Sequence, residues 1–216
     1  MSFDDDRAAM VDRLVSAGYA RTGRVIEALR KVQRHLFVPD EFKSSSYVDS
    51  PQPIGFNQTI SAPHMVAMMS ELLDVEPGLK VLEVGTGSGY QAAVLSVLSE
   101  PGRVVSVERV GELAGRTRRL LESLGYSNVS VVEGDGTIGY EADAPYDRII
   151  VTAAAPEVPM ALISQLASGG RMIVPVGSRL SQTLVEIMKD ERGEVTGRSH
   201  GGVVFVPLIG RHGWAD

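Results

Sequence analysis

The sequence predicts a doubly wound α/β fold, in which N-terminal helices precede a mostly parallel sheet with an antiparallel edge. From residue 80 onward, short apolar segments of strand length alternate with segments of helical periodicity, which is typical of a parallel sheet with helices on both faces. A glycine-rich turn follows the first of these strands, and a polar, glycine-containing segment joins the last two. With 216 residues, of which 44% are hydrophobic, the chain is long enough for a single domain with a full core.

The first 60 residues are predicted to contain helices followed by an irregular segment. Residues 5–34 carry apolar side chains at intervals of three to four and are interrupted by Gly18 and Gly23, which predicts two short helices. Residues 37–60 are rich in Pro, Ser and Gly but too apolar for a disordered linker. Packed irregular segments of this kind often shape a binding site.

A third helix is predicted to begin near residue 61. Ser61 is a typical helix cap, Pro63 suits the first turn, and apolar residues follow at helical spacing. Beyond it strands and helices alternate, and ligands are expected at the carboxyl ends of the parallel strands. The predicted strands are residues 80–84, 103–108, 129–134, 147–152, 170–176, 183–190 and 202–208. The helices predicted between these strands are residues 90–99, 111–125 and 159–167.

Composition and charge exclude several classes of function. A formal net charge of -6 and a pI of about 5.3 disfavour binding to nucleic acid, which requires a basic surface. The absence of cysteine excludes disulfides, zinc–thiolate sites and a cysteine nucleophile. The N-terminus is acidic and no apolar stretch is long enough to span a membrane, so we expect a cytoplasmic protein that does not bind membranes. The histidines are widely spaced and predict no metal site: His35, His64, His200 and His212.

The turn after the first parallel strand has the sequence EVGTGSGY. Its glycines, Gly85, Gly87 and Gly89, permit positive φ angles and let backbone N–H groups approach a polar ligand at the start of a helix. A dinucleotide-binding turn has the spacing G-x-G-x-x-G, but here Tyr90 occupies the position of the last glycine. The spacing is instead similar to that of S-adenosylmethionine-dependent methyltransferases, whose cofactor carries no phosphate.

Acidic residues stand at the ends of the first three parallel strands. Glu108 ends the second strand, where its carboxylate is expected to accept hydrogen bonds from both ribose hydroxyls. Asp135 follows the third and is expected to accept from an adenine amino group, with Gly136 allowing the backbone to approach the ring. One such acid is as readily explained by solvation of a loop, but three in succession favour a cofactor site. The predicted cofactor-binding residues of this region are Glu83, Gly85, Thr86, Gly87, Ser88, Glu108, Arg109, Asp135 and Gly136.

Seven segments along nearly the whole chain resemble, in the same order, signature segments of the protein-L-isoaspartate O-methyltransferases. QTISAPHM (58–65) and YDRIIVTAAAPEVP (146–159) are more particular than the glycine turn, which many methyltransferases share. The other segments are RHLFVPDEF (34–42), VLEVGTGSGYQAAVLS (81–96), EGDGTIGY (133–140), GGRMIVPVG (169–177) and VVFVPL (203–208). The resemblance implies one Rossmann-like class I methyltransferase domain, with an N-terminal helical and substrate-side segment (1–79), a cofactor-binding core (80–178) and C-terminal strands (179–216).

The resemblance also implies an activity and a set of site residues. The activity is methyl transfer from S-adenosylmethionine to the free α-carboxylate of L-isoaspartyl residues in damaged proteins, with D-aspartyl residues as a further candidate substrate. The methyl ester then collapses to a succinimide, and this begins the repair. The active-site role falls on Ser61, contacts to the cofactor on Thr59, His64 and Gln182, and contacts to the substrate on Ile60, Ser61, Val204, Val206 and Leu208. The sequence leaves the oligomeric state open.

A carboxylate acceptor is compatible with a serine that is not a nucleophile. A carboxylate with a pKa near 4 is already ionised at neutral pH, so the reaction requires no general base. Correct orientation of the reacting groups can lower the activation free energy by roughly 7–11 kcal/mol. We therefore hypothesise that Ser61 both caps the third helix and, together with the first N–H groups of that helix, holds the carboxylate.

Three other classes of function compete with this one. A tRNA methyltransferase can carry a similar glycine turn, but it requires a basic face that the acidic composition disfavours. A non-catalytic homologue would keep the fold, but the acids at the strand ends and Ser61 are all present. A nicotinamide oxidoreductase is disfavoured because Tyr90 replaces the last glycine of the dinucleotide pattern.

Overall fold

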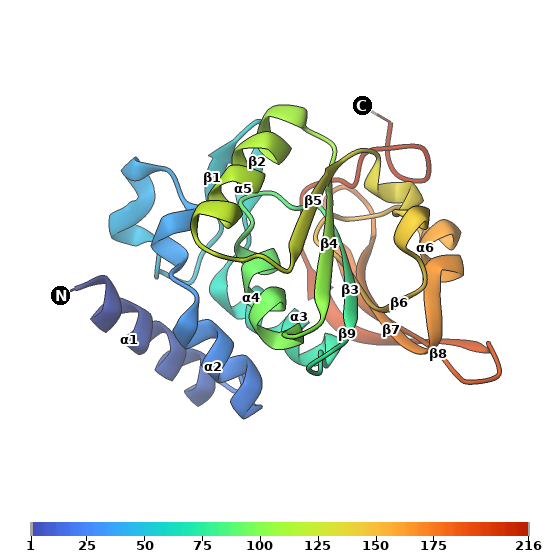
Figure 1. Ribbon diagram of the computed structural model, residues 1–216, viewed down its shortest axis with the longest axis horizontal. Coiled ribbons are helices and arrows are strands. Elements are labelled where there is room, and N and C mark those ends of the chain that lie inside the picture. Colours follow the sequence, from blue (N-terminus) through green and yellow to red (C-terminus); the bar gives the residue numbers. More distant parts are fainter. Residues whose placement is uncertain (1, 216) are drawn as a thin grey trace.

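The computed structural model describes residues 2–215, which form a central seven-stranded sheet with helices packed against it (Figure 1). The strands lie in the order β5-β4-β3-β6-β7-β8-β9; the first five are parallel, and β8 and β9 are antiparallel to their neighbours. The predicted doubly wound α/β fold with an antiparallel edge is therefore confirmed. The strands of the sheet are β3 (Lys80–Val84), β4 (Arg103–Glu108), β5 (Val129–Glu133), β6 (Tyr146–Val151), β7 (Leu166–Gly177), β8 (Gln182–Lys189) and β9 (Val195–Val203).

Both faces of the sheet are covered because its central strands are apolar on both sides. Val81 and Val104 pack into the core of one face, while Leu82 and Val105 pack into the core of the other. In Figure 1 helices α1 to α5 lie to the left of the sheet and α6 to its right. The helices are α1 (Phe3–Ser16), α2 (Gly23–Lys31), α3 (Pro63–Leu73), α4 (Tyr90–Ser99), α5 (Gly111–Ser123) and α6 (Met160–Gln165), with 3-10 helices η1 (Arg34–Phe37), η2 (Asp40–Ser45), η3 (Gly136–Ile138) and η4 (Glu141–Asp143). No helix within residues 2–215 has the length and apolar character needed to cross a membrane.

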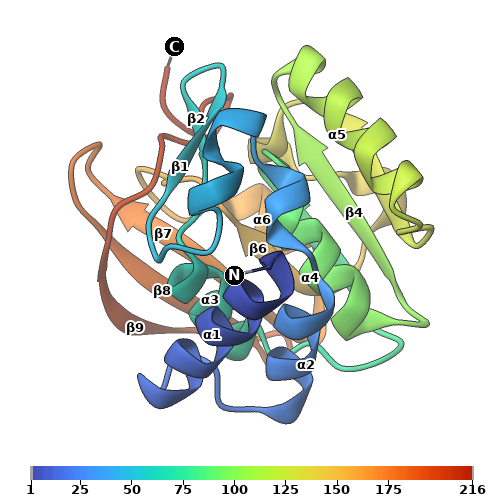
Figure 2. The same cartoon turned by 90° about the vertical axis from the view of Figure 1, so that its left-hand side faces the viewer.

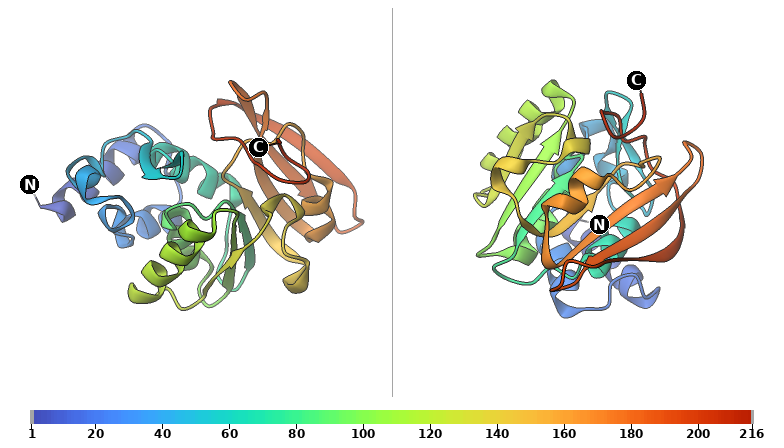
Figure 3. Two further views of the ribbon diagram at one scale, coloured as in Figure 1. Left: turned by 90° about the horizontal axis from the view of Figure 1, so that it is seen from above. Right: turned by 90° about the vertical axis from the view of Figure 1, so that its right-hand side faces the viewer.

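The N-terminal helices and the antiparallel edge of the sheet lie at opposite ends of the molecule (Figure 3). Figure 3 shows α1 and α2 at one end and the antiparallel strands β7 to β9 at the other. Apolar residues near the C-terminus complete the core of this chain, since Val203 is 7% and Phe205 9% exposed. Near the N-terminus, the ring of Phe3 stacks on that of His35 with centroids 4.1 Å apart.

The irregular segment predicted for residues 37–60 contains η2 and a hairpin of β1 (Gln52–Gly55) and β2 (Gln58–Ile60). The turn of the hairpin places Phe56 and Asn57 at φ angles of 55° and 56°, the left-handed values that a tight hairpin turn requires. Asparagine is common in this conformation but phenylalanine is rare, so the sequence did not indicate the hairpin. Figure 2 shows the hairpin at the same upper end of the molecule as the C-terminal segment.

Two predicted element boundaries are wrong. The last strand is β9, whose mostly polar residues pair with β8 through the backbone, whereas residues 204–208 of the predicted strand lie beyond its end. The third helix begins at Pro63 with Ala62 at its N-cap position. Ser61 therefore lies just outside α3 and does not cap it.

Candidate active site

A cleft of about 820 Å³, including its open mouth, lies at the carboxyl ends of β3, β4 and β6. Its position agrees with the rule that ligands bind at this edge of a parallel sheet. Four parts of the chain form most of its wall: residues 58–61, 84–88, 107–110 and 206–209. The cleft therefore joins the glycine turn to the segment that contains Ser61 and to the C-terminal segment.

The glycine turn has a backbone that only glycine adopts without strain. Gly85, Gly87 and Gly89 have φ angles of +96°, +52° and +88°. A Cβ on Gly85 would lie 2.5 Å from Oγ1 of Thr152, and this hydroxyl donates a hydrogen bond of 2.6 Å to the carbonyl oxygen of Gly85. Thr117 donates a hydrogen bond of 2.7 Å to the carbonyl oxygen of Gly87. These threonines fix the turn, whose Thr86 and Ser88 also line the cleft.

Glu108 lies at the end of β4 on the wall of the cleft and is 6% exposed. Its two carboxylate oxygens accept hydrogen bonds of 2.9 Å from the backbone N–H of Gly87 and 3.0 Å from that of Val110. Each carboxylate oxygen has a further lone pair, so Glu108 retains acceptor capacity on both oxygens. Arg109, its neighbour in the chain, also lines the cleft.

Glu83 does not line the cleft but lies fully buried behind the glycine turn. Its carboxyl group accepts a hydrogen bond from the hydroxyl of Ser106, which lies 2.6 Å from the hydroxyl of Thr86. Burial raises the pKa of Glu83 to about 8; the hydrogen bond from Ser106 lowers that pKa, and the nearby charge of Glu108 raises it. Burial therefore favours the neutral form of Glu83, which supports the turn from beneath.

Asp135 also lies outside the lining of the cleft, whereas its neighbour Gly136 is part of it. The carboxylate of Asp135 accepts hydrogen bonds from the N–H and hydroxyl of Thr137 and from the N–H of Arg211. Partial burial raises the pKa of Asp135, but the hydrogen bonds from Arg211 and Thr137 outweigh that effect and hold the pKa below its usual value. A Cβ on Gly136 would lie 2.5 Å from Cγ1 of Val84, so the wall of the cleft admits only glycine there.

Ser61 lines the cleft together with Thr59 and Ile60. Its backbone carbonyl accepts a hydrogen bond of 2.8 Å from Nη2 of Arg34. Within residues 2–215 its hydroxyl makes no hydrogen bond, which leaves it available to a ligand in the cleft.

His64 lies near Ser61 in sequence but not in the lining of the cleft. Its backbone N–H and its Nδ1 both lie 2.9 Å from Oδ1 of Asp49. Because His64 is in the first turn of α3, the Asp49 carboxylate satisfies one of the free N–H groups at the start of that helix. The cap that the sequence assigned to Ser61 is therefore provided by Asp49, which lies 15 residues before His64.

The C-terminal segment forms the remaining wall through Val206 and Leu208, while Val204 lies outside the lining and is 76% exposed. Ala154 fixes this segment, because its N–H donates to the carbonyl of Val206 and its carbonyl accepts from the N–H of Leu208, both at 2.8 Å. These bonds join the segment to the loop that follows β6.

Gln182 was expected at the cofactor, but it is 2% exposed and does not line the cleft. Its side-chain oxygen accepts a hydrogen bond of 2.8 Å from the N–H of Phe205, and its amide nitrogen donates to the carbonyl of Ser178. The structure therefore connects Gln182 to the C-terminal segment.

Three residues in or beside the cleft were not indicated by the sequence: Arg34, Asp49 and Thr152. The partners of each lie 15 to 68 residues away, at Ser61, His64 and the end of β3. No local spacing signals such contacts. The one signal in the sequence for Arg34 is its place in RHLFVPDEF, one of the segments that resemble the family.

Comparison with known proteins agrees with this geometry. The chain matches the family model described as protein-L-isoaspartate(D-aspartate) O-methyltransferase over residues 5–213. It is 57% identical over 212 residues to the protein-L-isoaspartate O-methyltransferase of Methanopyrus kandleri, covering 97% of this chain and 94% of that protein. It is 50% identical over 207 residues to that of Pyrococcus horikoshii, covering 95% and 94%.

Two solved structures of this kind superpose on nearly the whole chain. A Plasmodium falciparum structure described as a protein-L-isoaspartate O-methyltransferase in complex with S-adenosyl-L-homocysteine has a TM-score of 0.82 and 26% identity, covering 93% of this chain and 97% of that one. Another protein-L-isoaspartate O-methyltransferase has a TM-score of 0.86 and 31% identity, covering 96% and 67%. On the sequence match, the fold and the arrangement of the cleft together, this chain belongs to the protein-L-isoaspartate(D-aspartate) O-methyltransferase family.

Proposed function

We propose that this protein transfers a methyl group from S-adenosylmethionine to the α-carboxylate of L-isoaspartyl residues in damaged proteins. One observation carries the proposal: a single cleft is lined both by the glycine turn with Glu108 and by Ser61. The first group suits a nucleoside cofactor and the second suits a carboxylate, so a donor and an acceptor can meet there. The acidic net charge of the chain argues against a nucleic-acid substrate.

The residues of the cleft fit the cofactor. Gly85 and Gly136 line the cleft, and a Cβ on either would lie 2.5 Å from a neighbouring side chain, so backbone atoms rather than side chains face a flat ring or a sugar there. Glu108 retains a lone pair on each oxygen, which matches the two hydroxyls of a ribose. When bound, S-adenosylmethionine supplies a methyl group on a positively charged sulfur. We propose that Glu108, Arg109, Gly136 and the glycine turn hold it.

Ser61 and the C-terminal segment are proposed to hold the acceptor. The carboxylate of an isoaspartyl residue is ionised at neutral pH, so the chain has to orient it rather than deprotonate it. The Ser61 hydroxyl has no partner within residues 2–215 and can donate a hydrogen bond to that carboxylate. Val206 and Leu208 line the same cleft, where a peptide chain can lie against them.

We place the reaction in the cytoplasm, on proteins and peptides that have accumulated isoaspartyl linkages. D-aspartyl residues are a second substrate to be tested. Thr59 lies on the wall of the cleft beside the acceptor site, whereas Asp135, His64 and Gln182 act from outside its lining.

The test is methyl incorporation from labelled S-adenosylmethionine into two peptides that differ only in one isoaspartyl or normal aspartyl linkage. We expect label on the isoaspartyl peptide alone, released as methanol by base. A D-aspartyl peptide and a tRNA transcript complete the set of acceptors. Label on tRNA alone would overturn the acceptor assignment. The absence of any label, with S-adenosylhomocysteine still raising the melting temperature, would leave cofactor binding without this activity.

A further inference from the structure

Arg34 is a fully buried arginine directly beneath the wall of the cleft. It begins η1 and has 0% of its surface exposed. Its Nε donates a hydrogen bond of 2.8 Å to the carbonyl of Ser46, and its Nη2 donates one of 2.8 Å to the carbonyl of Ser61. Its guanidinium carbon also lies 4.9 Å from the centre of the Tyr90 ring. Both Ser61 and Tyr90 line the cleft.

The charge of Arg34 is not neutralised by a contacting carboxylate within residues 2–215. Nη1 is buried and has no hydrogen-bond partner in that part of the chain. Burial lowers the pKa of Arg34 to about 10, while the neighbouring Tyr90, Asp49 and Tyr47 raise it, so the side chain remains charged at neutral pH. A buried charge without a paired carboxylate is costly for stability. Because Arg34 lies beside the cleft, its charge can act on a ligand bound there.

We propose that Arg34 is a positioning residue for the acceptor: it fixes the Ser61 backbone against the turn at Ser46 and places a positive charge behind the wall that receives the substrate carboxylate. The guanidinium fork joins two carbonyls from separate parts of the chain, which a single ammonium group does not reproduce. The buried charge is weakly screened by solvent and therefore attracts an anion in the cleft. This inference rests on the proposed function. It makes Arg34 one of the residues by which the enzyme prefers a carboxylate acceptor.

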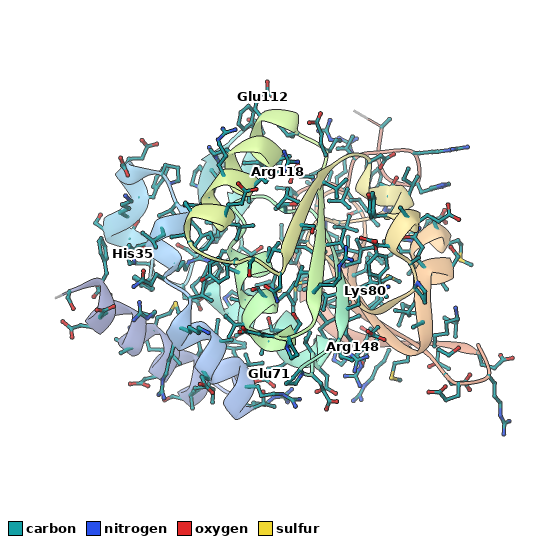
Figure 4. The ribbon with its side chains drawn as sticks, viewed as in Figure 1. His35, Glu71, Lys80, Glu112, Arg118 and Arg148 are labelled. Atoms are coloured by element: carbon teal, nitrogen blue, oxygen red, sulfur yellow. The ribbon has the colours of Figure 1, made fainter. Side chains whose placement is uncertain are left out.

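The experiment compares Arg34→Lys and Arg34→Met with a matched control, Arg148→Met. Arg148 is a partly buried arginine in β6 that also donates to two backbone carbonyls, those of Asp74 and Asp147, and burial lowers its pKa as well. Figure 4 shows Arg148 at the lower edge of the molecule, at the opposite end from the hairpin. For each variant, kcat and KM for the isoaspartyl peptide, the Kd of S-adenosylhomocysteine and the melting temperature are measured.

The two contributions of Arg34 predict different kinetic changes. Arg34→Lys keeps the charge but loses the fork, so kcat should fall by about 10- to 100-fold, with little change in the peptide KM. Arg34→Met loses both, so the peptide KM should also rise by about tenfold. In Arg34→Lys the Kd of S-adenosylhomocysteine should stay within about threefold of wild type, and Arg148→Met should keep kcat and KM within that range.

The outcomes separate the inference from the proposed function. Folded Arg34 variants with the wild-type kcat and peptide KM would overturn the role of Arg34. The same holds if Arg34→Lys loses S-adenosylhomocysteine binding, activity and melting temperature in parallel, since that pattern indicates only a structural role. If Arg34→Met fails to fold, Arg34→Lys decides the question. A wild-type protein that methylates no isoaspartyl peptide would instead refute the proposed function.

Discussion

The two walls of the cleft are assembled in different ways. The wall formed by the glycine turn and Glu108 comes from β3, β4 and the loops that directly follow them, and Glu108 bonds to the turn itself through Gly87. The opposite wall combines Ser61 with the C-terminal segment, which lie at distant points of the chain. Remote side chains bond to that second wall or beside it: Arg34 bonds to Ser61, Asp49 to His64 at the start of α3, and Gln182 to Phe205.

This difference separates two tasks of the proposed enzyme. The cofactor is the same in every turnover, and a turn fixed by local hydrogen bonds suits an invariant ligand. The acceptor is one residue in a variable peptide, and the segments that meet it rest on a few long-range contacts. We therefore expect changes on the second wall to impair use of the peptide while cofactor binding persists.

The largest effect is expected from Ser61→Ala. Removing a hydrogen-bond donor that orients the reacting carboxylate should lower kcat by about 10²- to 10³-fold. Because Ser61 lies outside α3 and does not cap it, the free energy of unfolding should change by less than about 1 kcal/mol. Peptide kinetics, chemical denaturation and the Kd of S-adenosylhomocysteine measure these quantities. Full activity in this variant would remove Ser61 from the mechanism.

The next effect is expected from Asp49→Ala. This change removes the acceptor of the His64 N–H in the first turn of α3, and loss of such a cap costs about 0.5–2 kcal/mol of stability. The start of α3 adjoins Ser61, so kcat should fall by about tenfold as well. Asp40→Ala is the matched control, because the Asp40 side chain is 92% exposed and pairs only with Lys43 among the salt bridges within residues 2–215. A stability equal to that of the control would show that Asp49 does not cap the helix.

Gln182→Ala distinguishes two roles for a residue that the sequence placed at the cofactor. Loss of its side chain leaves the N–H of Phe205 without its acceptor and loosens the C-terminal segment. We expect the peptide KM to rise by about 3- to 10-fold while the Kd of S-adenosylhomocysteine stays constant. Isothermal titration and peptide kinetics give the two values. A weaker Kd with an unchanged peptide KM would restore the original assignment to the cofactor.

The sequence predicted the locally determined parts of the molecule well. The parallel strands and the helices between them are continuous apolar segments, and the glycine turn shows itself by spacing alone. The hairpin of β1 and β2 was not predicted, because Phe56 has a left-handed conformation that phenylalanine rarely adopts. The last strand was predicted at residues 202–208, mostly after the true β9. The residues of β9 are mostly polar and form an exposed edge, where pairing depends on the backbone rather than on apolar side chains.

In the candidate site, too, the residues placed by local sequence were predicted and those held by remote contacts were not. The turn and Glu108 stand on the cleft wall because strand ends of a parallel sheet meet at one edge. Ser61 was placed in the cleft by resemblance, but its assignment as a cap was wrong because a remote acid, Asp49, satisfies the helix. Spacing along the chain contains no information about such a partner, nor about the buried contact of Arg34.

The smallest effect on turnover is expected from Glu83→Gln, and it tests the wall that the sequence predicted best. Burial raises the pKa of Glu83 from 4.5 to about 8, so between these values the native state holds a proton that the unfolded chain has released. Stability from this group is therefore complete below pH 4.5 and is lost as the pH rises towards 8. A neutral amide does not titrate, so wild type should lose stability relative to Glu83→Gln over this window, by an amount on the order of a few kcal/mol. Denaturation curves at several pH values measure the difference. A constant difference across the window would mean that Glu83 is ionised in the folded protein and that the turn rests on a charge rather than on a neutral acid.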